Sequence, residues 1–383
     1  MASTDKELDR RLTEEDLPKP PPGLRFELWY QDRAAAINDF VNQVFETERS
    51  VEGAIWKYFQ VHPEASVGVA IQEEDNTLVG AHPNIIRRLW LDGRELPIFH
   101  IADVAISPHY RRGIALYRSF IRHVQVQGVL QGVLFGYGGR ITEENRKIGK
   151  RLVGYEDLMQ LETLERRLSL RMAVSKRVGH ALGEAAGAVG SAFYKARYRG
   201  SHGSWTVEEA EKVGFGPEYD RLWESLRERH RICLVRDAAV LNWRYSENPA
   251  SGFHLFEAKN QSGDLSGFLV MRVYSEGDAK LALVLDLQDQ GEAAMAQALL
   301  EGATAAAVHQ GCDFLRFAPC PGSSAAQAVA AAGGFREAPV PRDNVIFKSL
   351  APSAAAYGEQ AAAELLAGGG HWYYTQGDSD FLE

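Results

Sequence analysis

The chain carries one sequence pattern twice, and this repeat is the feature that most constrains its fold. Residues 56–58, Trp-Lys-Tyr, recur as residues 243–245, Trp-Arg-Tyr. Residues 78–80, Leu-Val-Gly, recur as residues 265–267, Leu-Ser-Gly. Both pairs lie 187 positions apart (243 − 56 = 187 and 265 − 78 = 187). Two independent words at one spacing predict that a single structural unit is built twice.

Each copy is predicted to contain the same order of elements: a helix, antiparallel strands, a central strand, a helix, a strand, a helix and a final strand. Residues 66–72 are mostly apolar, residues 75–77 form a polar turn, and a second strand begins at Leu78. Residues 290–310 are rich in Ala and Leu at helical spacing, and Gly311 ends them. The chain is therefore expected to form two copies of one α/β unit.

An anion-binding turn is predicted in the first copy. The strand-like run 104–106 leads to a basic turn with Arg111, Arg112 and Gly113, and a helical pattern begins at Ile114. A helix entered in this way presents free N–H groups and its positive dipole end to the turn. Gly113 would let a ligand approach the backbone closely, and a pyrophosphate is the expected ligand. The alternative is an ordinary strand-to-helix turn with two solvated arginines.

This arrangement resembles the acyl-CoA pyrophosphate loop of the GNAT N-acetyltransferase superfamily. The family pattern, Arg/Gln-x-x-Gly-x-Gly/Ala, falls on residues 110–115, where Gly113 and Ala115 fit and Tyr110 replaces the usual Arg or Gln. The order of elements is similar to a GNAT domain over roughly residues 24–160 and 230–350. The resemblance implies an α/β fold with two tandem GNAT-like domains, each a mixed, mostly antiparallel twisted sheet flanked by helices. Such tandem proteins are found near bacterial polysaccharide or natural-product genes.

The resemblance and the local composition divide the chain into four expected segments. These are a disordered lead-in at 1–23, an N-terminal acyl-CoA-binding GNAT domain at 24–162, a basic helical linker at 163–229, and a degenerate C-terminal GNAT-like domain at 230–383 that ends in an aromatic strand at Trp372 and Tyr373. Residues 166–200 carry eight Lys and Arg residues against one acid, Glu184. This stretch could make a weak contact with an anionic surface, or it could be a solvated linker.

The resemblance also implies which residues bind the donor. They belong to the central strand, the basic turn, the start of the helix after it, and the Asn at the start of a later helix: Val104, Ala105, Ile106, Arg111, Arg112, Gly113, Ile114, Ala115 and Asn145. In the second copy, Asp289 and Glu292 stand where a phosphate would bind, and two carboxylates would repel it. Only the N-terminal copy is therefore expected to bind acyl-CoA, while the C-terminal copy shapes the acceptor site or acts as a scaffold.

Acyl transfer from a thioester to an amine needs a base for the amine, polarisation of the carbonyl and a proton for the thiolate. Asp103, near the end of the central strand, is the first candidate for the base, and His100 could share this role or relay protons. The alternative for Asp103 is an ion pair with an arginine such as Arg140. Tyr137 is the candidate acid, with Tyr155 as a second choice.

Composition narrows the function further. The net charge of −9 argues against a nucleic-acid binder. The three cysteines have no metal-ligand spacing, so no metal is expected and a reducing compartment is favoured. Residues 1–11 do not resemble a secretory signal, and no run is long enough to span a membrane.

The sequence thus predicts a cytoplasmic N-acyltransferase that uses acetyl-CoA or another acyl-CoA and transfers the acyl group directly to a small or sugar-like amine. Two alternatives remain at this point. One is a Fem-type aminoacyl transferase that uses aminoacyl-tRNA, and the other is a non-catalytic acyl-CoA-binding or scaffold protein. The sequence does not predict the oligomeric state.

Overall fold

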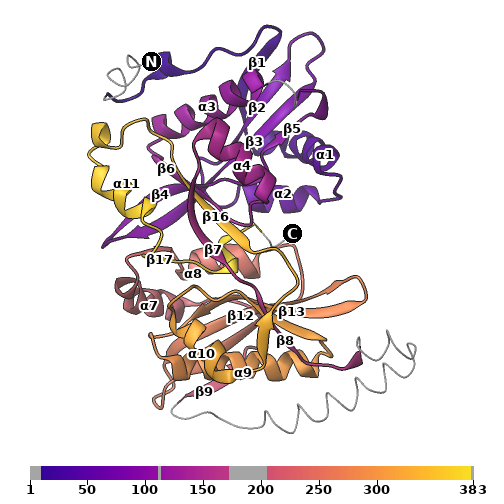
Figure 1. Ribbon diagram of the computed structural model, residues 1–383, viewed down its shortest axis with the longest axis vertical. Helices are drawn as coiled ribbons and strands as arrows, with labels where there is room; N and C mark the ends of the chain where they lie inside the picture. Colours follow the sequence, from indigo (N-terminus) through magenta and orange to yellow (C-terminus); the bar gives the residue numbers. More distant parts are fainter. Residues whose placement is uncertain (1–9, 111–113, 172–204, 381–383) are drawn as a thin grey trace.

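Two mixed sheets, flanked by helices, form the protein and lie one above the other in Figure 1. The computed structural model describes residues 10–110, 114–171 and 205–380. Within these ranges the upper sheet has ten strands and the lower sheet seven. The expected α/β fold with two GNAT-like sheets is confirmed.

The first sheet has a main path of seven strands. In spatial order these are β1 (Leu24–Trp29), β2 (Ser66–Gln72), β3 (Leu78–Leu91), β4 (Arg94–His100), β6 (Phe135–Gly138), β16 (Asp343–Ser349) and β7 (Glu156–Leu161). Three short strands join it beside this path: β5 (Ala105–Ile106) and β10 (Ile232–Leu234) pair with β3, and β17 (Trp372–Tyr373) pairs with β10. Among the described strands of this sheet, β4–β6 and β10–β17 pair in parallel and the other pairs are antiparallel.

The strands of the second sheet follow a similar spatial order to those of the first. Its strands are β15 (Phe335–Glu337), β8 (Leu164–Arg167), β14 (Phe314–Phe317), β13 (Ala279–Gln288), β12 (Leu265–Glu276), β11 (Phe253–Lys259) and β9 (Thr206–Glu209). The pair β13–β14 is parallel, as β4–β6 is in the first sheet.

Helices cover both sheets (Figure 1). They are α1 (Ala34–Phe45), α2 (Val51–Tyr58), α3 (Ile114–Leu130), α4 (Glu143–Val153), α7 (Pro217–Leu226), α8 (Ala238–Leu241), α9 (Ala293–His309), α10 (Ser324–Ala332) and α11 (Gln360–Ala367). The stripe Leu116, Phe120 and Val124 turns one side of α3 to the first sheet and is buried there. This packing is close because Gly68 on β2 lies under Val124, where an added Cβ would come within 2.5 Å of Cγ2.

Equivalent elements of the two sheets recur along the chain at a spacing that shortens from 187 to 179 positions. β2 and β11 begin and end 187 positions apart, whereas α3 and α9, both 17 residues long, lie 179 positions apart (293 − 114 = 179). The two repeated tryptophans meet between the sheets. The rings of Trp56 and Trp243 stack with centroids 5.4 Å apart, and each indole N–H donates to the other residue's backbone carbonyl at 2.5 and 2.9 Å. The repeated words thus meet in a reciprocal contact.

The two halves of the chain exchange their final strands. β8 follows the first copy but lies between β14 and β15 of the second sheet, while β16 lies between β6 and β7 of the first. β10 and β17 also join the first sheet. The two sheets therefore do not follow the predicted domain boundaries at 162 and 230, because β10, β16 and β17 come from the predicted C-terminal domain but lie in the first sheet. Each exchanged strand hydrogen-bonds two neighbours that would otherwise leave edges exposed.

The predicted lead-in and linker also differ from expectation where the structure describes them. Leu12 packs against the core of the first sheet, and Arg11 donates to the carbonyl of Ala356. The predicted linker contains β8, β9 and α7. Arg166 is buried, and Arg171 pairs with buried Asp313, so both serve internal contacts. The rest of the predicted basic stretch, 172–200, lies outside the described residues. Across the described ranges, no helix combines the length and the apolar character needed to cross a membrane.

Candidate active site

The first sheet contains a fork, where its two central parallel strands part. β4 and β6 pair through Phe99 and His100, and the last hydrogen bond joins the Ile101 N–H to the Tyr137 carbonyl at 2.7 Å. Beyond this point β5 pairs with β3, and β6 pairs with β16. We call residues 101–106 and 137–141 the first fork. Strand ends that part in this way leave backbone groups available to a ligand.

The backbone turns sharply inside the first fork at Asp103. Its φ of 49° lies in the left-handed region, which a non-glycine residue adopts only when its surroundings hold it there. Its carboxylate lies 2.5 Å from Lys57 Nζ and 2.9 Å from Arg49 Nη1, and it accepts a hydrogen bond from the Tyr58 hydroxyl at 2.8 Å. The contacts of Asp103 therefore fix the shape of the fork.

These contacts also decide the charge of Asp103. Burial alone would raise the pKa of its carboxyl, but Lys57 and Arg49 lower it below the ordinary value. A carboxylate held in this way is a weak proton acceptor, so the geometry disfavours the predicted role as base. The alternative prediction of an ion pair fits better, although the partners are Lys57 and Arg49. Arg140 instead has its Nε 3.4 Å from Asp343.

His100 and Tyr137, the other two predicted catalytic residues, lie side by side on β4 and β6. Their rings stack with centroids 4.8 Å apart and planes 5° apart. Burial holds the pKa of His100 well below its ordinary value, so the imidazole is neutral at pH 7. Its Nε2 has no hydrogen-bond partner among the described residues. The Tyr137 hydroxyl donates to the Asp378 carbonyl at 3.0 Å, and burial raises its pKa. These features disfavour Tyr137 as an acid.

Apolar side chains surround the first fork. Val104 and Ile141, from its two sides, pack into a cluster with Ile101, Tyr155 and Ile346. Tyr155 is buried, and its ring lies under Gly149 of α4, so that a Cβ at that glycine would meet it at 2.0 Å. Burial raises the pKa of Tyr155 as well, which disfavours it as an acid.

The predicted donor residues that the structure describes lie in the first fork and on α3 and α4. Ala105 and Ile106 are buried in β5, and Val104 precedes them. Ile114 and Ala115 are exposed in the first turn of α3, and Asn145 is exposed in the first turn of α4. Arg111, Arg112 and Gly113 lie outside the described residues.

Tyr110, which departs from the family pattern, turns toward the sheet. Its hydroxyl donates to Gln72 Oε1 at 2.6 Å. The residue at this motif position therefore anchors the turn to β2.

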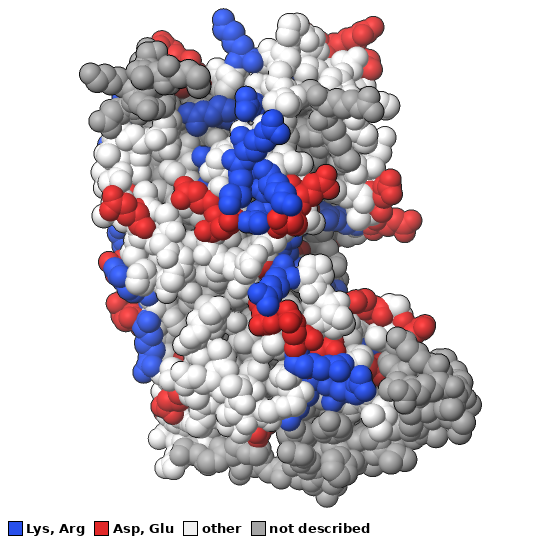
Figure 2. Space-filling model, in the orientation of Figure 1, with Lys and Arg blue, Asp and Glu red and all other residues white. Residues whose placement is uncertain are grey.

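A basic surface lies beside the first fork on α4. Figure 2 shows Lys and Arg side chains gathered over this helix, with Asp and Glu side chains flanking them. Arg146 Nη1 and Lys150 Nζ share the carboxylate of Asp157 at 2.7 and 2.6 Å, and Lys147 and Arg151 are exposed. Such a surface attracts phosphates, with a strength that falls as salt increases.

The second sheet has an equivalent fork, which the chain's own C-terminal strand crosses, and a cavity of about 420 Å³ remains beside that strand. β13 and β14 pair as far as Val284 and Phe317, and we call residues 284–289 and 317–323 the second fork. The C-terminal strand β17 bridges its two sides. The Tyr373 hydroxyl donates to the Leu287 carbonyl, and the Cys320 thiol donates to the Trp372 carbonyl at 3.3 Å.

Asp289 occupies the position at which a phosphate was predicted to be repelled. Its carboxylate accepts hydrogen bonds from the Gly291 N–H at 2.6 Å and from the Ser324 hydroxyl at 2.6 and 2.8 Å. Burial raises its pKa. The second fork thus supplies its own carboxylate to a donor just before α9 and to the first residue of α10.

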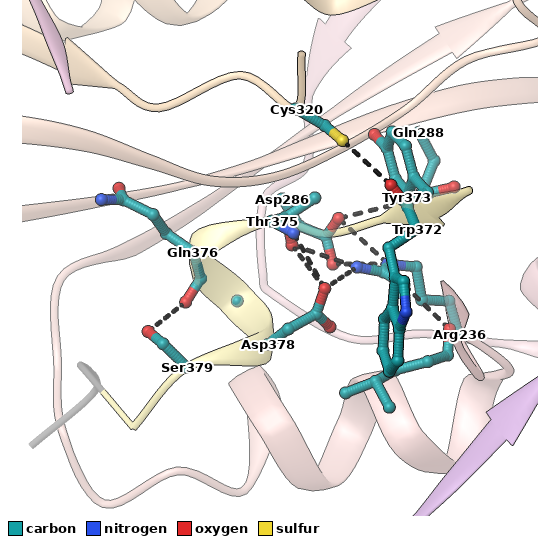
Figure 3. A network of polar contacts seen from close by, with 12 residues as sticks. Arg236, Asp286, Gln288, Cys320, Trp372, Tyr373, Thr375, Gln376, Asp378 and Ser379 are labelled. Atoms are coloured by element: carbon teal, nitrogen blue, oxygen red, sulfur yellow. Dashed lines mark hydrogen bonds and ion pairs between the residues drawn. The ribbon is translucent and has the colours of Figure 1, made fainter. Parts of the chain in front are cut away.

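A buried ionic network fixes the C-terminal segment between the sheets (Figure 3). Arg236 Nε lies 3.1 Å from an oxygen of Asp286, and its Nη2 lies 2.7 Å from Asp378 and 3.1 Å from the Thr375 hydroxyl. Arg244 donates to the carbonyls of Gly377 and Ser379. The second domain thus holds the segment whose Asp378 carbonyl contacts Tyr137.

The ionic contacts of the two forks correspond to each other. Asp103 contacts Arg49 and Tyr58, and Asp286 contacts Arg236 and Tyr245 in the same way, with both partner pairs 187 positions apart (236 − 49 = 187 and 245 − 58 = 187). The sequence analysis missed Arg236 and Asp378. The spacing between Arg49 and Arg236 was a usable signal for the former, whereas the tail residue Asp378 has no counterpart at this offset.

In the described part of the chain, no group of His, Cys, Asp and Glu side chains has the arrangement of a metal site. The three cysteines, Cys233, Cys312 and Cys320, are buried and free.

Comparison with solved structures identifies the same fold elsewhere. A GCN5-related N-acetyltransferase from Anabaena variabilis superposes with a TM-score of 0.59 and 13% identity, over 85% of this chain and 73% of that chain. A probable N-acyltransferase from Enterococcus faecalis gives 0.60 and 11%, over 86% and 73%. Saccharomyces cerevisiae N-myristoyltransferase with bound myristoyl-CoA gives 0.58 and 10%, over 89% and 87%. Identities this low show the fold alone. In sequence, neither a family model nor a curated protein matches the chain.

Proposed function

We propose that the protein is an acyl-CoA-dependent N-acyltransferase that binds its donor at the first fork and transfers the acyl group directly to a small amine. One observation carries this proposal. The two central parallel strands of the first sheet part between an apolar cluster and the start of a helix, while the equivalent place in the second sheet is crossed by β17 and carries the Asp289 carboxylate. The neighbours named above support an acyl-CoA donor, and acetyl-CoA is the form we propose.

The proposed donor site keeps the residues expected from the sequence. Backbone groups of Val104, Ala105 and Ile106 would hold the thioester and its pantetheine arm. The turn of Arg111, Arg112 and Gly113, with Ile114 and Ala115 in the helix after it, would bind the pyrophosphate. Asn145, in the first turn of α4, would contact the pantetheine.

Among the predicted catalytic residues, we propose His100 as the base. The pKa of His100 is lowered too, but its Nε2 is unpartnered among the described residues, whereas three side chains contact the Asp103 carboxylate. This nitrogen therefore has a lone pair for a proton from the amine. Asp103 then acts as a positioning residue, because its contacts fix the backbone of the fork. Tyr137 supports His100 through the ring stack, and the thiolate would take its proton from solvent.

The fixed offsets, the reciprocal tryptophans and the exchanged strands support a tandem repeat of one GNAT-like unit. In this proposal the first unit binds the donor and the second holds the C-terminal segment. We propose a cytoplasmic protein, because its three cysteines are free.

Turnover with a free-thiol readout tests this function. Acetyl-CoA and a panel of small amines should release CoA with wild-type protein, and His100→Ala should lower kcat by 10²-fold or more. His123→Ala is a control on α3, where the half-buried ring contacts Phe26 of β1, and it should leave kcat unchanged. Acetyl-CoA binding without release of thiol for any amine would favour the non-catalytic alternative, and release that depends on an aminoacyl-tRNA would favour the Fem-type alternative.

A further inference from the structure

A cavity lies where the two sheets meet, next to the first fork. Its volume is about 610 Å³, within the usual range for small-molecule sites. Residues 140–143, which directly follow β6, form one wall, and Tyr274, Leu283 and Arg316 of the second sheet form another. Ile141 borders this cavity and also packs into the apolar cluster of the first fork. Ile141 is therefore common to the cavity and to the proposed donor site.

The charges that line the cavity are already balanced by protein partners. Arg140 pairs with Asp343, Arg316 with Glu276 at 3.1 Å, and Glu143 with Arg146 at 2.9 Å. Figure 2 shows both basic and acidic side chains in the region between the two sheets. A site in which each cation has its own carboxylate does not favour a phosphate or another strongly charged ligand.

Amide, hydroxyl and aromatic groups supply the remaining surface. Gln376, in the C-terminal segment, borders the cavity; its Nε2 donates to Asp343 at 2.9 Å, while its buried Oε1 has no hydrogen-bond donor among the described residues. Figure 3 shows this side chain directed away from the Arg236 network. Thr163 adds a hydroxyl, and Tyr274 adds a ring beside the apolar Leu283. Ring faces and balanced hydrogen-bonding groups suit a ligand with many hydroxyls and an apolar face.

We propose that this cavity binds the acceptor, and that the acceptor is a hydroxyl-rich amine of amino-sugar size. This inference rests on the proposed function for the identity of the reaction, but the cavity can be tested by itself. The ligand's hydroxyls would bond the Arg140–Asp343 pair and Gln376, and its amine would face the first fork past residues 140–143. The amine nitrogen attacks the thioester carbonyl, the C–S bond breaks, the thiolate leaves with CoA, and the amine loses one proton to His100.

The test uses a variant that fills the cavity. Val340 lies in its wall on a loop, half-buried, so Val340→Trp adds bulk there while Val340→Ala serves as the matched control. Glucosamine, lysine and spermidine are titrated into the full-length protein by calorimetry, with and without CoA. Of the three ligands, we expect only glucosamine to bind. Val340→Trp should weaken its affinity at least tenfold, and Val340→Ala should change that affinity less than threefold. Gln376→Leu should weaken it about fivefold.

Calorimetry with acetyl-CoA separates the two proposals. If acetyl-CoA does not bind but glucosamine binds and Val340→Trp blocks it, the proposed function fails and the cavity proposal holds for binding. If acetyl-CoA binds equally to wild type and Val340→Trp while glucosamine does not bind, the cavity proposal is overturned and the donor proposal is retained. Tighter binding of lysine or spermidine than of glucosamine would also overturn the proposed ligand class.

Discussion

The two forks share one geometry but differ in what fills them. In each, two parallel strands part beside a buried aspartate that contacts an arginine and a tyrosine. The arginine of the second copy lies 187 positions after that of the first, and so does the tyrosine. Asp103 has two cations, Lys57 and Arg49, which lower the pKa of its carboxyl. Asp286 shares Arg236 with a second carboxylate, Asp378, and burial raises its pKa.

The difference shows how a repeated unit can divide its work. In the second copy, Arg244 stands where Lys57 stands in the first, and it binds carbonyls of the C-terminal segment instead of the fork's aspartate. That segment then crosses to Tyr137 in the first fork. The second fork thus has a structural role, because it holds the C-terminal segment.

The largest effect is expected from Arg236→Met. The substitution leaves Asp286 and Asp378 buried without their cation, which costs about 3–5 kcal/mol of unfolding free energy. Arg49→Met should cost less, because Lys57 remains beside Asp103. Urea unfolding measures both, with Arg231→Met as a control in an exposed pair that is worth at most about 1 kcal/mol. Equal losses for Arg236 and Arg49 would remove the contrast between the two forks.

An exchange of residues between the two turns sharpens the comparison. Glu292 precedes α9 as Gly113 precedes α3, since the two helices lie 179 positions apart (292 − 113 = 179). Gly113→Glu should weaken acetyl-CoA binding roughly 100-fold, or about 3 kcal/mol, because it places a carboxylate where the pyrophosphate binds.

The reverse change, Glu292→Gly, should create no second site, because Asp289 and Tyr373 still fill the second fork. Fluorescence or calorimetric titration measures both variants. If Glu292→Gly bound a second acetyl-CoA, the charge of the turn alone would account for the difference in acetyl-CoA binding between the two forks.

Acid should destabilise the protein through its buried histidines. Burial lowers the pKa of His82, on β3, to about 4, and the pKa of His230, stacked on Tyr373 at the second fork, to about 4. The unfolded chain binds protons below pH 6.5 and the folded chain does not, so stability falls as pH drops from 6.5 toward 4.

His82→Gln should remove up to about 3 kcal/mol of this loss at pH 4. Unfolding free energies at pH 7 and pH 4.5 measure the slope. A variant with the slope of wild type would mean that His82 is protonated in the folded protein.

The smallest effect is expected where the two copies meet. Trp56→Phe and Trp243→Phe each remove an indole donor to a buried carbonyl, which should cost about 1–2 kcal/mol per residue. Because the rings also stack, the double variant should lose less than the sum by about 0.5–1.5 kcal/mol. Strictly additive losses would mean that the two residues act independently.

Much of this architecture was predictable from the spacing of a few residues. The words at 56–58 and 243–245 predicted a repeated unit, and the two tryptophans meet between its copies. The exchange of β8 and β16 was not predictable, because both copies end in a similar strand and either sheet could pair with it. The edges that receive these strands are defined only in three dimensions.

The candidate site, like the fold, was predictable from the sequence only in part. Asp103 was expected near the end of a central strand, but it lies in the turn between β4 and β5 with a φ of 49°. Its partners Lys57 and Arg49 come from the segment around α2 and gave no local signal. Likewise, Tyr137 looked available until the C-terminal segment placed the Asp378 carbonyl on its hydroxyl. The contacts of Asp103 span 46 and 54 positions (103 − 57 and 103 − 49), and that of Tyr137 spans 241, all beyond the reach of periodicity or motif.

The number of acetyl-CoA molecules bound per chain tests the account most directly. Calorimetric titration of the full-length protein should give one site, which Gly113→Glu weakens and which Tyr373→Ala leaves in place. Two sites on the wild-type chain, or a single site lost in Tyr373→Ala and kept in Gly113→Glu, would place the donor in the second fork and contradict the division of work between the two.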